Sequence, residues 1–224
     1  MFIKTHLESL RKTIPETVCL VAVSKTKPNE DILEAYENGQ RHFGENNARE
    51  MQAKAQGLPK DIHWHFIGHL QTNKVKYIAP WVDLIHSVDS LKVLKEIDRQ
   101  AEKNEKTIRC LLQFHIAEEE TKFGLNLQEA EQLINSPEYN AMAHIQLSGV
   151  MGMATYTENQ AQIRREFKQL KVWFDHLKTH YFSETPEFKE ISMGMSGDYQ
   201  LAIEEKSTLV RIGSLIFGAR SCVL

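Results

Sequence analysis

A lysine two residues beyond an apolar, β-branched run is the strongest candidate nucleophile in the sequence. Strand alternation places Val21, Val23 and Lys25 on one face of the expected strand. A lysine at the rim of such a strand can be partly desolvated, and desolvation favours the neutral amine that forms a Schiff base. The alternative is a solvated surface lysine. Lys27, next to Pro28, is the weaker candidate.

Two loops late in the chain have residues suited to an anion. After one predicted strand the chain reads SMGMSGD at 192–198, where small residues let backbone N–H groups approach a phosphate and Ser196 adds a hydroxyl donor. Asp198 opposes this interpretation unless its carboxylate caps the following helix. Gly213 and Ser214, after the last predicted strand, offer further donors. Barrels often bind phosphate between such loops, although two tight turns with ordinary caps give the same pattern.

Arg211 lies inside the last predicted strand, where alternation groups it with Leu209 and Gly213. A buried arginine has to be paired. Two interpretations are open: a structural ion pair with a strand carboxylate, or a donor directed at a heteroatom of a ligand.

Other polar residues near the predicted strand ends have more than one interpretation. Asn46 could hydrogen-bond a substituent of a ligand ring, or it belongs to a capping turn. The segment 63–69 is rich in histidine, and we interpret these side chains as hydrogen-bonded core in preference to metal ligands. Met151 and Met153 are interpreted as packing at a strand end.

The elements that would position these residues alternate along the chain. Short apolar runs predict eight strands, and the segments between them have helical periodicity. Eight strands alternating with helices in about this length favour a (β/α)8 barrel, an α/β fold. An open doubly wound sheet has the same order of strands and helices along the chain and is the alternative. A helix carrying Ile3, Leu7 and Leu10 precedes the first strand. The predicted strands are Val18–Val23, Arg41–Phe43, His63–Ile67, Leu84–Val88, Ile108–His115, Ile145–Met151, Phe188–Ser192 and Leu209–Ile212.

Composition excludes several classes of protein. The 224 residues are 42% hydrophobic and 25% charged, with 27 basic and 30 acidic side chains, a net charge of -3. This balance gives neither a basic stripe for nucleic acid nor a polybasic membrane patch. Cys19, Cys110 and Cys222 are too few and too far apart for a disulfide framework or a zinc site, and the first two are expected in the core. With neither a signal sequence nor a membrane-length apolar run, we expect a cytoplasmic protein.

Taken together, the motifs resemble those of the pyridoxal phosphate homeostasis protein family, which is related to the barrel domain of alanine racemase. The resemblance extends over nearly the whole chain and implies one modified (β/α)8 TIM barrel domain, residues 1–224. The matching stretches are AVSKTKP at 22–28, FGENN at 43–47, HWHFIGHLQTNK at 63–74, HSVDS at 86–90, SMGMSGD at 192–198 and VRIGSLIFGAR at 210–220.

The resemblance also assigns roles to individual residues. It implies that Lys25 holds pyridoxal 5′-phosphate as an internal aldimine, with Asn46 beside the ring and Arg211 facing the pyridine nitrogen. Ser196, Gly213 and Ser214 would bind the phosphate. The sequence departs from the family at 47–50 and at 114–117, so the rim of the site is less well defined and His115 is assigned no role.

Three functions are compatible with these residues. The leading hypothesis is a cofactor carrier or buffer without robust catalysis: an arginine leaves the pyridine nitrogen unprotonated, which makes the ring a weaker electron sink. Racemases of this kind also take a second base from another domain, for which the dozen residues after Ile212 are too few. The alternatives are an amino-acid racemase or related enzyme, and an aldolase whose Lys25 binds a phosphorylated sugar. A monomer that transiently meets pyridoxal phosphate-dependent apoenzymes is expected.

Overall fold

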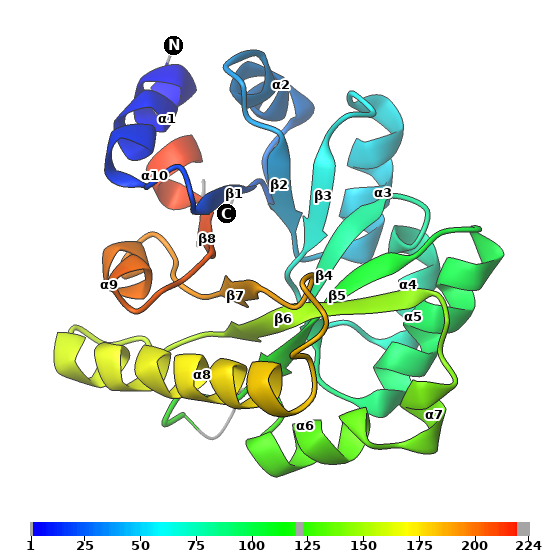
Figure 1. Ribbon diagram of the computed structural model, residues 1–224. Helices are drawn as coiled ribbons and strands as arrows, with labels where there is room; N and C mark the ends of the chain where they lie inside the picture. Colours follow the sequence, from blue (N-terminus) through cyan, green and yellow to red (C-terminus); the bar gives the residue numbers. More distant parts are fainter. Residues whose placement is uncertain (1, 120–122, 219–224) are drawn as a thin grey trace.

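In the computed structural model, which describes residues 2–119 and 123–218, eight parallel strands close into a barrel (Figure 1). Each strand pairs with its neighbours in sequence, and β1 pairs with β8 through Leu20 opposite Val210. This confirms the predicted TIM barrel and excludes the open sheet. The strands are β1 (Cys19–Val23), β2 (His42–Glu45), β3 (His63–Phe66), β4 (Val82–Val88), β5 (Ile108–Phe114), β6 (Ile145–Gly152), β7 (Glu190–Ser192) and β8 (Leu209–Ile212).

Helices surround the barrel, and the extra N-terminal helix is present beside the last helix of the described chain (Figure 1). The helices are α1 (Phe2–Thr13), α2 (Asn29–Glu37), α3 (Ala48–Gly57), α4 (Thr72–Ile78), α5 (Leu91–Lys103), α6 (Leu127–Ile134), α7 (Pro137–Asn140), α8 (Gln160–His180), α9 (Tyr199–Glu204) and α10 (Ser214–Phe217). Side-chain caps fix several starts. Asn47 accepts hydrogen bonds from the first turn of α3, and Ser90 and Asn159 do the same for α5 and α8. That the domain spans residues 1–224 stays a prediction.

Most predicted strands differ from the structure by one or two residues at an end, and two of the differences have an identifiable reason. The second strand continues to Glu45, because that carboxylate is buried and ion-paired with Lys54. The seventh begins at Glu190, while Phe188 packs face to face on Phe182 with ring centroids 4.1 Å apart. In both places tertiary contacts override the local polarity pattern.

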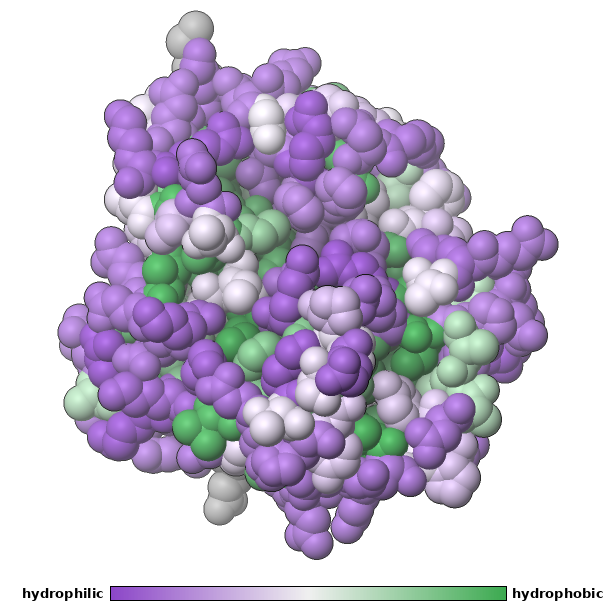
Figure 2. Space-filling model, viewed as in Figure 1, coloured by the Kyte–Doolittle hydropathy of each residue, from purple (hydrophilic) through white to green (hydrophobic). Residues whose placement is uncertain are grey.

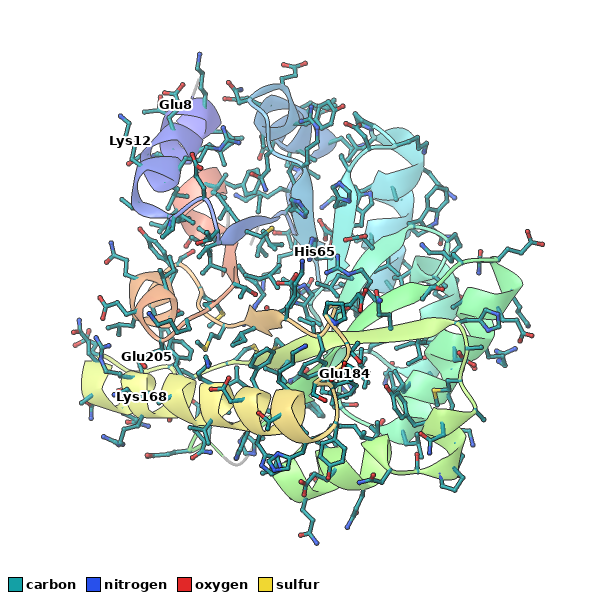
Figure 3. The ribbon with its side chains drawn as sticks, in the orientation of Figure 1. Glu8, Lys12, His65, Lys168, Glu184 and Glu205 are labelled. Carbon is teal, nitrogen blue, oxygen red and sulfur yellow. The ribbon has the colours of Figure 1, made fainter. Side chains whose placement is uncertain are left out.

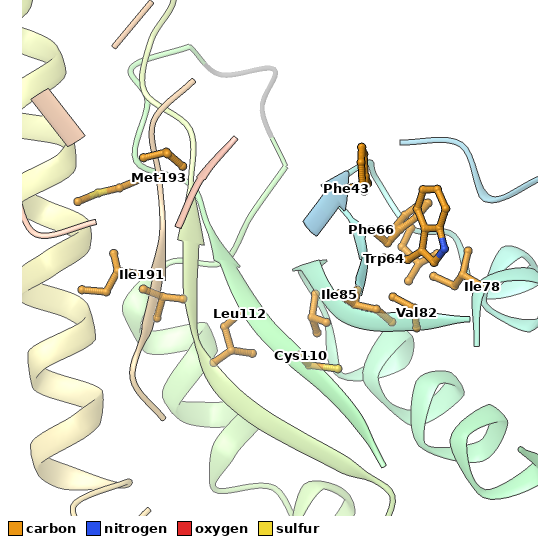
Figure 4. Close-up of a cluster of buried hydrophobic side chains, with 14 of the residues drawn as sticks. Phe43, Trp64, Phe66, Ile78, Val82, Ile85, Cys110, Leu112, Ile191 and Met193 are labelled. Carbon is orange, nitrogen blue, oxygen red and sulfur yellow. The ribbon is translucent and has the colours of Figure 1, made fainter. Parts of the chain in front are cut away.

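The apolar core has two layers, separated by the strands. Inside the barrel the inner cluster contains Val21, Leu84, Leu111, Met151 and Leu209. The larger outer layer lies between the barrel and its helices; Figure 4 shows part of it, from Phe43, Trp64 and Phe66 to Ile191 and Met193. The alternation of strand side chains produces this division, because successive residues point to opposite faces.

Of the two cysteines expected in the core, one is fully buried and the other half-buried. Cys110 is fully buried, and Cys19 is half-buried against the inner cluster. Burial is the main cause that raises the pKa of the Cys19 thiol to about 12, so this group stays protonated at neutral pH. Cys222 lies outside the described residues.

The outer surface is mainly hydrophilic on the face shown in Figure 2. In Figure 3 the labelled side chains of Glu8, Lys12, Lys168 and Glu205 lie on or beside the outer helices, whereas His65 lies in the middle of the barrel. Among the described residues, no helix has both the length and the apolar character that membrane crossing requires.

Candidate functional site

A pocket of about 830 Å³ opens at the carboxyl ends of the strands. All of the side chains and backbone segments predicted to form a site line it: Lys25, Asn46, Ser196, Arg211, Gly213 and Ser214. They follow or belong to β1, β2, β7 and β8, whose ends meet because the barrel is closed. The sequence-based grouping of these residues is therefore correct as geometry, while their binding roles stay predictions.

The first strand carries Lys25 to the pocket as its alternation predicts. Val21 belongs to the inner cluster, Val23 lines the pocket, and Lys25 follows as a half-buried side chain. Lys27 also lines the pocket, but its ammonium donates a hydrogen bond of 2.9 Å to the carbonyl oxygen of Phe217. The second lysine thus fixes the last turn of α10, a structural contact consistent with its weaker candidacy.

A group of charges, of which Glu45 and Lys54 are buried and Glu50 is half-buried, lies behind the lysine loop. We call Ser24, Glu45, Glu50 and Lys54 the ionic cluster. The Lys54 ammonium lies 2.8 Å from Glu45 Oε1 and 2.7 Å from Glu50 Oε1, and the Ser24 hydroxyl donates to Glu45 Oε1 at 2.6 Å. Glu45 is fully buried, and burial raises its pKa, an effect that Lys54 partly offsets.

The ionic cluster fixes the backbone on both sides of Lys25. Lys54 donates a hydrogen bond of 2.8 Å to the Ser24 carbonyl oxygen, and the Thr26 N–H donates to Glu50 Oε1 at 2.6 Å. Thr26 has φ of 64°, in the left-handed region that β-branched residues avoid. The turn that presents Lys25 is therefore held in a strained conformation by the ionic cluster, through the half-buried Glu50.

Two loops meet on the side of the pocket predicted to bind an anion. Gly213 N–H donates to Ser196 Oγ at 3.4 Å, which links the loop after β7 to the loop after β8. The N–H groups of Ser214 and Leu215 begin α10 and so have no acceptor within that helix. These loops supply backbone and hydroxyl donors on one wall of the pocket.

Asp198 lines the same pocket but does not cap the next helix as the anion interpretation required. Its Oδ1 instead accepts a hydrogen bond of 2.5 Å from the Met195 N–H. The carboxylate is thus engaged by its own loop. Its charge favours the protonated form of Arg211 across the pocket.

Arg211 is 4% exposed and lines the pocket floor. It donates to Ser192 Oγ at 2.5 Å and to the Gly152 carbonyl oxygen at 3.1 Å. Burial lowers its pKa to about 10, so the guanidinium stays charged at neutral pH. Its partners on the strands are neutral, in contrast to the strand carboxylate of one sequence interpretation.

The rim is formed by Asn46, whose side chain is exposed. Gly68 passes so close that a Cβ built on it would lie 2.2 Å from the Asn46 carbonyl oxygen. A side chain at 68 would therefore displace the rim. This close approach of backbone explains the glycine after β3.

His69 is a pocket residue that sequence reasoning missed, because the whole segment 63–69 was interpreted as core. His65 is indeed buried, but His69 lines the pocket, where its Nδ1 lies 3.3 Å from Asp89 Oδ2. Its ring stacks on Phe123 with centroids 4.0 Å apart. The available signal was its place: it follows β3 at the end where the other site residues gather. Met153 likewise lines the pocket as well as packing on the inner cluster.

Comparison with known proteins agrees with this architecture. Residues 2–221 match the family described as alanine racemase, N-terminal domain, so fold and site define a barrel of that class. Several relatives at 36–40% identity are named pyridoxal phosphate homeostasis protein; the one from Aquifex aeolicus is 40% identical over 90% of this chain and 86% of its own length. The chain belongs to the pyridoxal phosphate homeostasis protein family.

Two solved structures of PipY from Synechococcus elongatus are similar over 96% of this chain and the whole of theirs. The structure without pyridoxal phosphate superposes with a TM-score of 0.87 at 35% identity. The structure described as having pyridoxal phosphate bound gives 0.84 at 34% identity. The barrel described here therefore closely matches one for which a cofactor-bound form exists.

Proposed function

We propose that this chain binds pyridoxal 5′-phosphate in the pocket and holds it as an aldimine on Lys25. The observation that carries the proposal is the convergence of Lys25, the buried Arg211 and two donor loops on a single pocket. Condensation of the lysine amine with the cofactor aldehyde forms a carbon–nitrogen double bond and releases one water. The bound form of the similar PipY structure supports the proposal.

The residues present fit such a group. Arg211 is a donor without acceptor capacity, so it suits an unprotonated ring nitrogen. Gly213 packs against β1 so closely that a Cβ would lie 3.1 Å from the Val23 carbonyl oxygen, and this keeps the backbone of the loop near the pocket wall. Ser196 bonds to that same loop. A pocket of this size is in the range of small-molecule sites, about 300–1,000 Å³.

Each predicted residue then has one task. Ser196, Gly213 and Ser214 bind the phosphate through hydroxyl and backbone donors. Arg211 orients the ring, and Asn46 borders it at the rim. When bound, the cofactor supplies a reversible carbonyl for amines.

We infer that the protein acts as a carrier or buffer in pyridoxal phosphate homeostasis, without robust catalysis. A charged arginine at the ring nitrogen keeps that nitrogen unprotonated and so withholds the electron sink that carbanion chemistry needs. We expect a cytoplasmic monomer that passes the cofactor to pyridoxal phosphate-dependent apoenzymes.

Borohydride trapping followed by mass measurement tests the site. Reduction of the protein loaded with pyridoxal 5′-phosphate should add one pyridoxyl phosphate, and Lys25→Ala should abolish this addition. Lys27→Ala is the matched control, because Lys27 lines the same pocket and should leave trapping intact. Trapping that persists in Lys25→Ala would overturn the assignment. An added mass of a sugar phosphate after isolation from cells would favour the aldolase alternative.

One observation favours a second function, an amino-acid racemase or related enzyme. The pair of His69 and Asp89 places an imidazole in the pocket that also contains Lys25, and a histidine oriented by a carboxylate is a common general acid or base. Exchange of the α-proton of an amino acid in deuterated water, in excess of protein and lost in His69→Gln, would support this function. Its absence in the loaded protein would exclude it for the amino acids tested.

A further inference from the structure

A chain of hydrogen bonds crosses the barrel interior and ends at Arg211. From the arginine, which donates to Ser192, the chain continues through His86 Nδ1, 2.8 Å from Ser192 Oγ. His86 Nε2 lies 2.8 Å from His65 Nδ1, and His65 Nε2 lies 3.0 Å from His42 Nδ1. Figure 3 labels His65, the middle ring. We call this set the histidine relay: His42, His65, His86, Ser192 and Arg211.

The two inner rings use both of their nitrogens within the relay. His65 and His86 are 1% and 0% exposed, and burial lowers the pKa of each well below the ordinary value of 6.5. Both are therefore neutral, and a neutral imidazole has one N–H and one lone pair. The hydrogen bonds through the rings must consequently all point the same way, either from Arg211 outward or toward it.

The arginine end decides the direction. A guanidinium only donates, so Ser192 Oγ accepts from Arg211. Ser192 is fully buried, and within residues 2–119 and 123–218 its hydroxyl has two hydrogen-bond partners, Arg211 and His86. If the hydroxyl hydrogen goes to His86, every donor of the relay has an acceptor. If His86 donates instead, the hydroxyl hydrogen is buried without one, which costs free energy.

We propose that the relay points outward from Arg211, and that His42, His65, His86 and Ser192 are positioning residues for this arginine. Each of the three histidines then has its proton on Nε2 and its lone pair on Nδ1. The relay holds Arg211 toward the pocket without introducing a carboxylate that would compete for its charge. The consequence for cofactor binding rests on the proposed function; the direction of the relay does not.

Nitrogen NMR of protein labelled with ¹⁵N-histidine, without added ligand and at neutral pH, tests the direction. We expect the three relay histidines to show a protonated Nε2 and an unprotonated Nδ1. Wild-type protein alone decides this point, so no variant has to fold. Relay histidines protonated on Nδ1 would overturn the proposal.

Ser192→Ala tests whether the Ser192 hydroxyl sets the tautomers of the relay histidines. Within residues 2–119 and 123–218 it removes the only donor to His86 Nδ1, so the tautomer preference of His65 and His86 should be lost. Ser148→Ala is the matched control: Ser148 is equally buried, and its hydroxyl bonds to the Gln146 carbonyl oxygen at 3.4 Å, outside the relay. An unchanged tautomer pattern in folded Ser192→Ala would contradict this role of the hydroxyl.

Titration with pyridoxal 5′-phosphate then measures the consequence for Arg211. Affinity should fall about tenfold in Ser192→Ala, equivalent to ~1.4 kcal/mol, and stay unchanged in Ser148→Ala. Equal affinity in both variants would show that Ser192 does not position the arginine. If wild-type protein fails to bind, the proposed function fails while the NMR result still decides the direction of the relay.

Discussion

Lys25 and Arg211, two basic residues of the pocket, are supported by polar networks of opposite character. Behind Lys25 lies the ionic cluster, which joins β1, β2 and α3 through charged groups. Behind Arg211 lies the histidine relay, whose other members are neutral and come from β2, β3, β4 and β7. The cluster is local, whereas the relay crosses the barrel.

The difference follows from what each network has to hold. Hydrogen bonds that Lys54 donates to the Ser24 carbonyl oxygen and that Glu50 accepts from the Thr26 N–H fix the backbone on either side of Lys25, including a strained turn at Thr26. The relay fixes a side chain that is already charged and buried, and neutral partners satisfy its donors without adding further charge to the interior. Charged side chains thus fix the loop that carries Lys25, whereas neutral hydrogen-bonding side chains orient the cationic Arg211.

Removing the cation of the ionic cluster should have the largest effect on stability. Lys54→Met leaves Glu45 fully buried with its ion pair broken, and breaking such a pair typically costs about 3–5 kcal/mol. Urea unfolding should show this loss. Lys171→Met is the control: Lys171 pairs with Asp175 four residues away, the spacing that Lys54 has to Glu50, but this pair is on the surface, where about 0–1 kcal/mol is expected. Equal losses would show that Glu45 is not penalised by burial.

Breaking the relay at its outer end should cost less. His42→Leu leaves one buried nitrogen, Nε2 of His65, without a partner, which costs about 1–3 kcal/mol. His63→Leu disrupts the same ring stack with His42, whose centroids are 4.8 Å apart, but leaves the relay complete. Thermal unfolding of the two variants separates hydrogen bonding from stacking. A greater loss in His63→Leu would contradict the relay's contribution to stability.

The pH dependence of stability should report the protonation of Glu45 in the ionic cluster. Because burial raises the pKa of Glu45 above its ordinary value of 4.5, the folded state binds this proton more readily than the unfolded state. The stability contributed by Glu45 is therefore greatest below pH ~4.5 and is lost as pH rises through the raised pKa, by at most ~1.4 kcal/mol per pH unit.

Glu45→Gln removes this titration, so its stability relative to wild type should increase as pH rises from ~4.5. Urea unfolding of both proteins at a series of pH values measures the difference. A relative decrease would mean that Lys54 outweighs burial and that the pKa of Glu45 is lowered instead.

The alternation of strands and helices along the chain predicted an α/β fold, and the family resemblance favoured the barrel and grouped Lys25 with Arg211. The sequence did not predict the relay or the position of His69. Alternation says which face a side chain is on, but it cannot say how far along the barrel axis two residues on different strands meet. That depends on strand register, which shifts between Trp64 and His65 where β3 pairs with β4. Lys54 was missed for a related reason, since a lysine on a helix is usually solvated.

The smallest effect concerns the strained turn that the ionic cluster holds. Thr26→Gly relieves a left-handed conformation that costs roughly 1–2 kcal/mol for a residue with a Cβ. Glycine also raises the conformational entropy of the unfolded chain, which lowers the free energy of unfolding by roughly 0.5–1 kcal/mol. A net stabilisation of about 0–1.5 kcal/mol is expected in urea unfolding. Thr26→Ala keeps the Cβ, and both variants keep the backbone bond to Glu50, so Ala should give no such gain.

Equal gains in Gly and Ala would assign the effect to loss of the threonine side chain and not to strain. Combining Thr26→Gly with Lys54→Met sharpens the comparison of the two networks. If the ionic cluster holds the turn in its strained conformation, part of the stabilisation from Lys54 offsets that strain. Without the strain, loss of Lys54 should cost less, so the double variant should lose less stability than the sum of the single changes. Strict additivity would mean that the charges stabilise one another without acting on the turn beside Lys25.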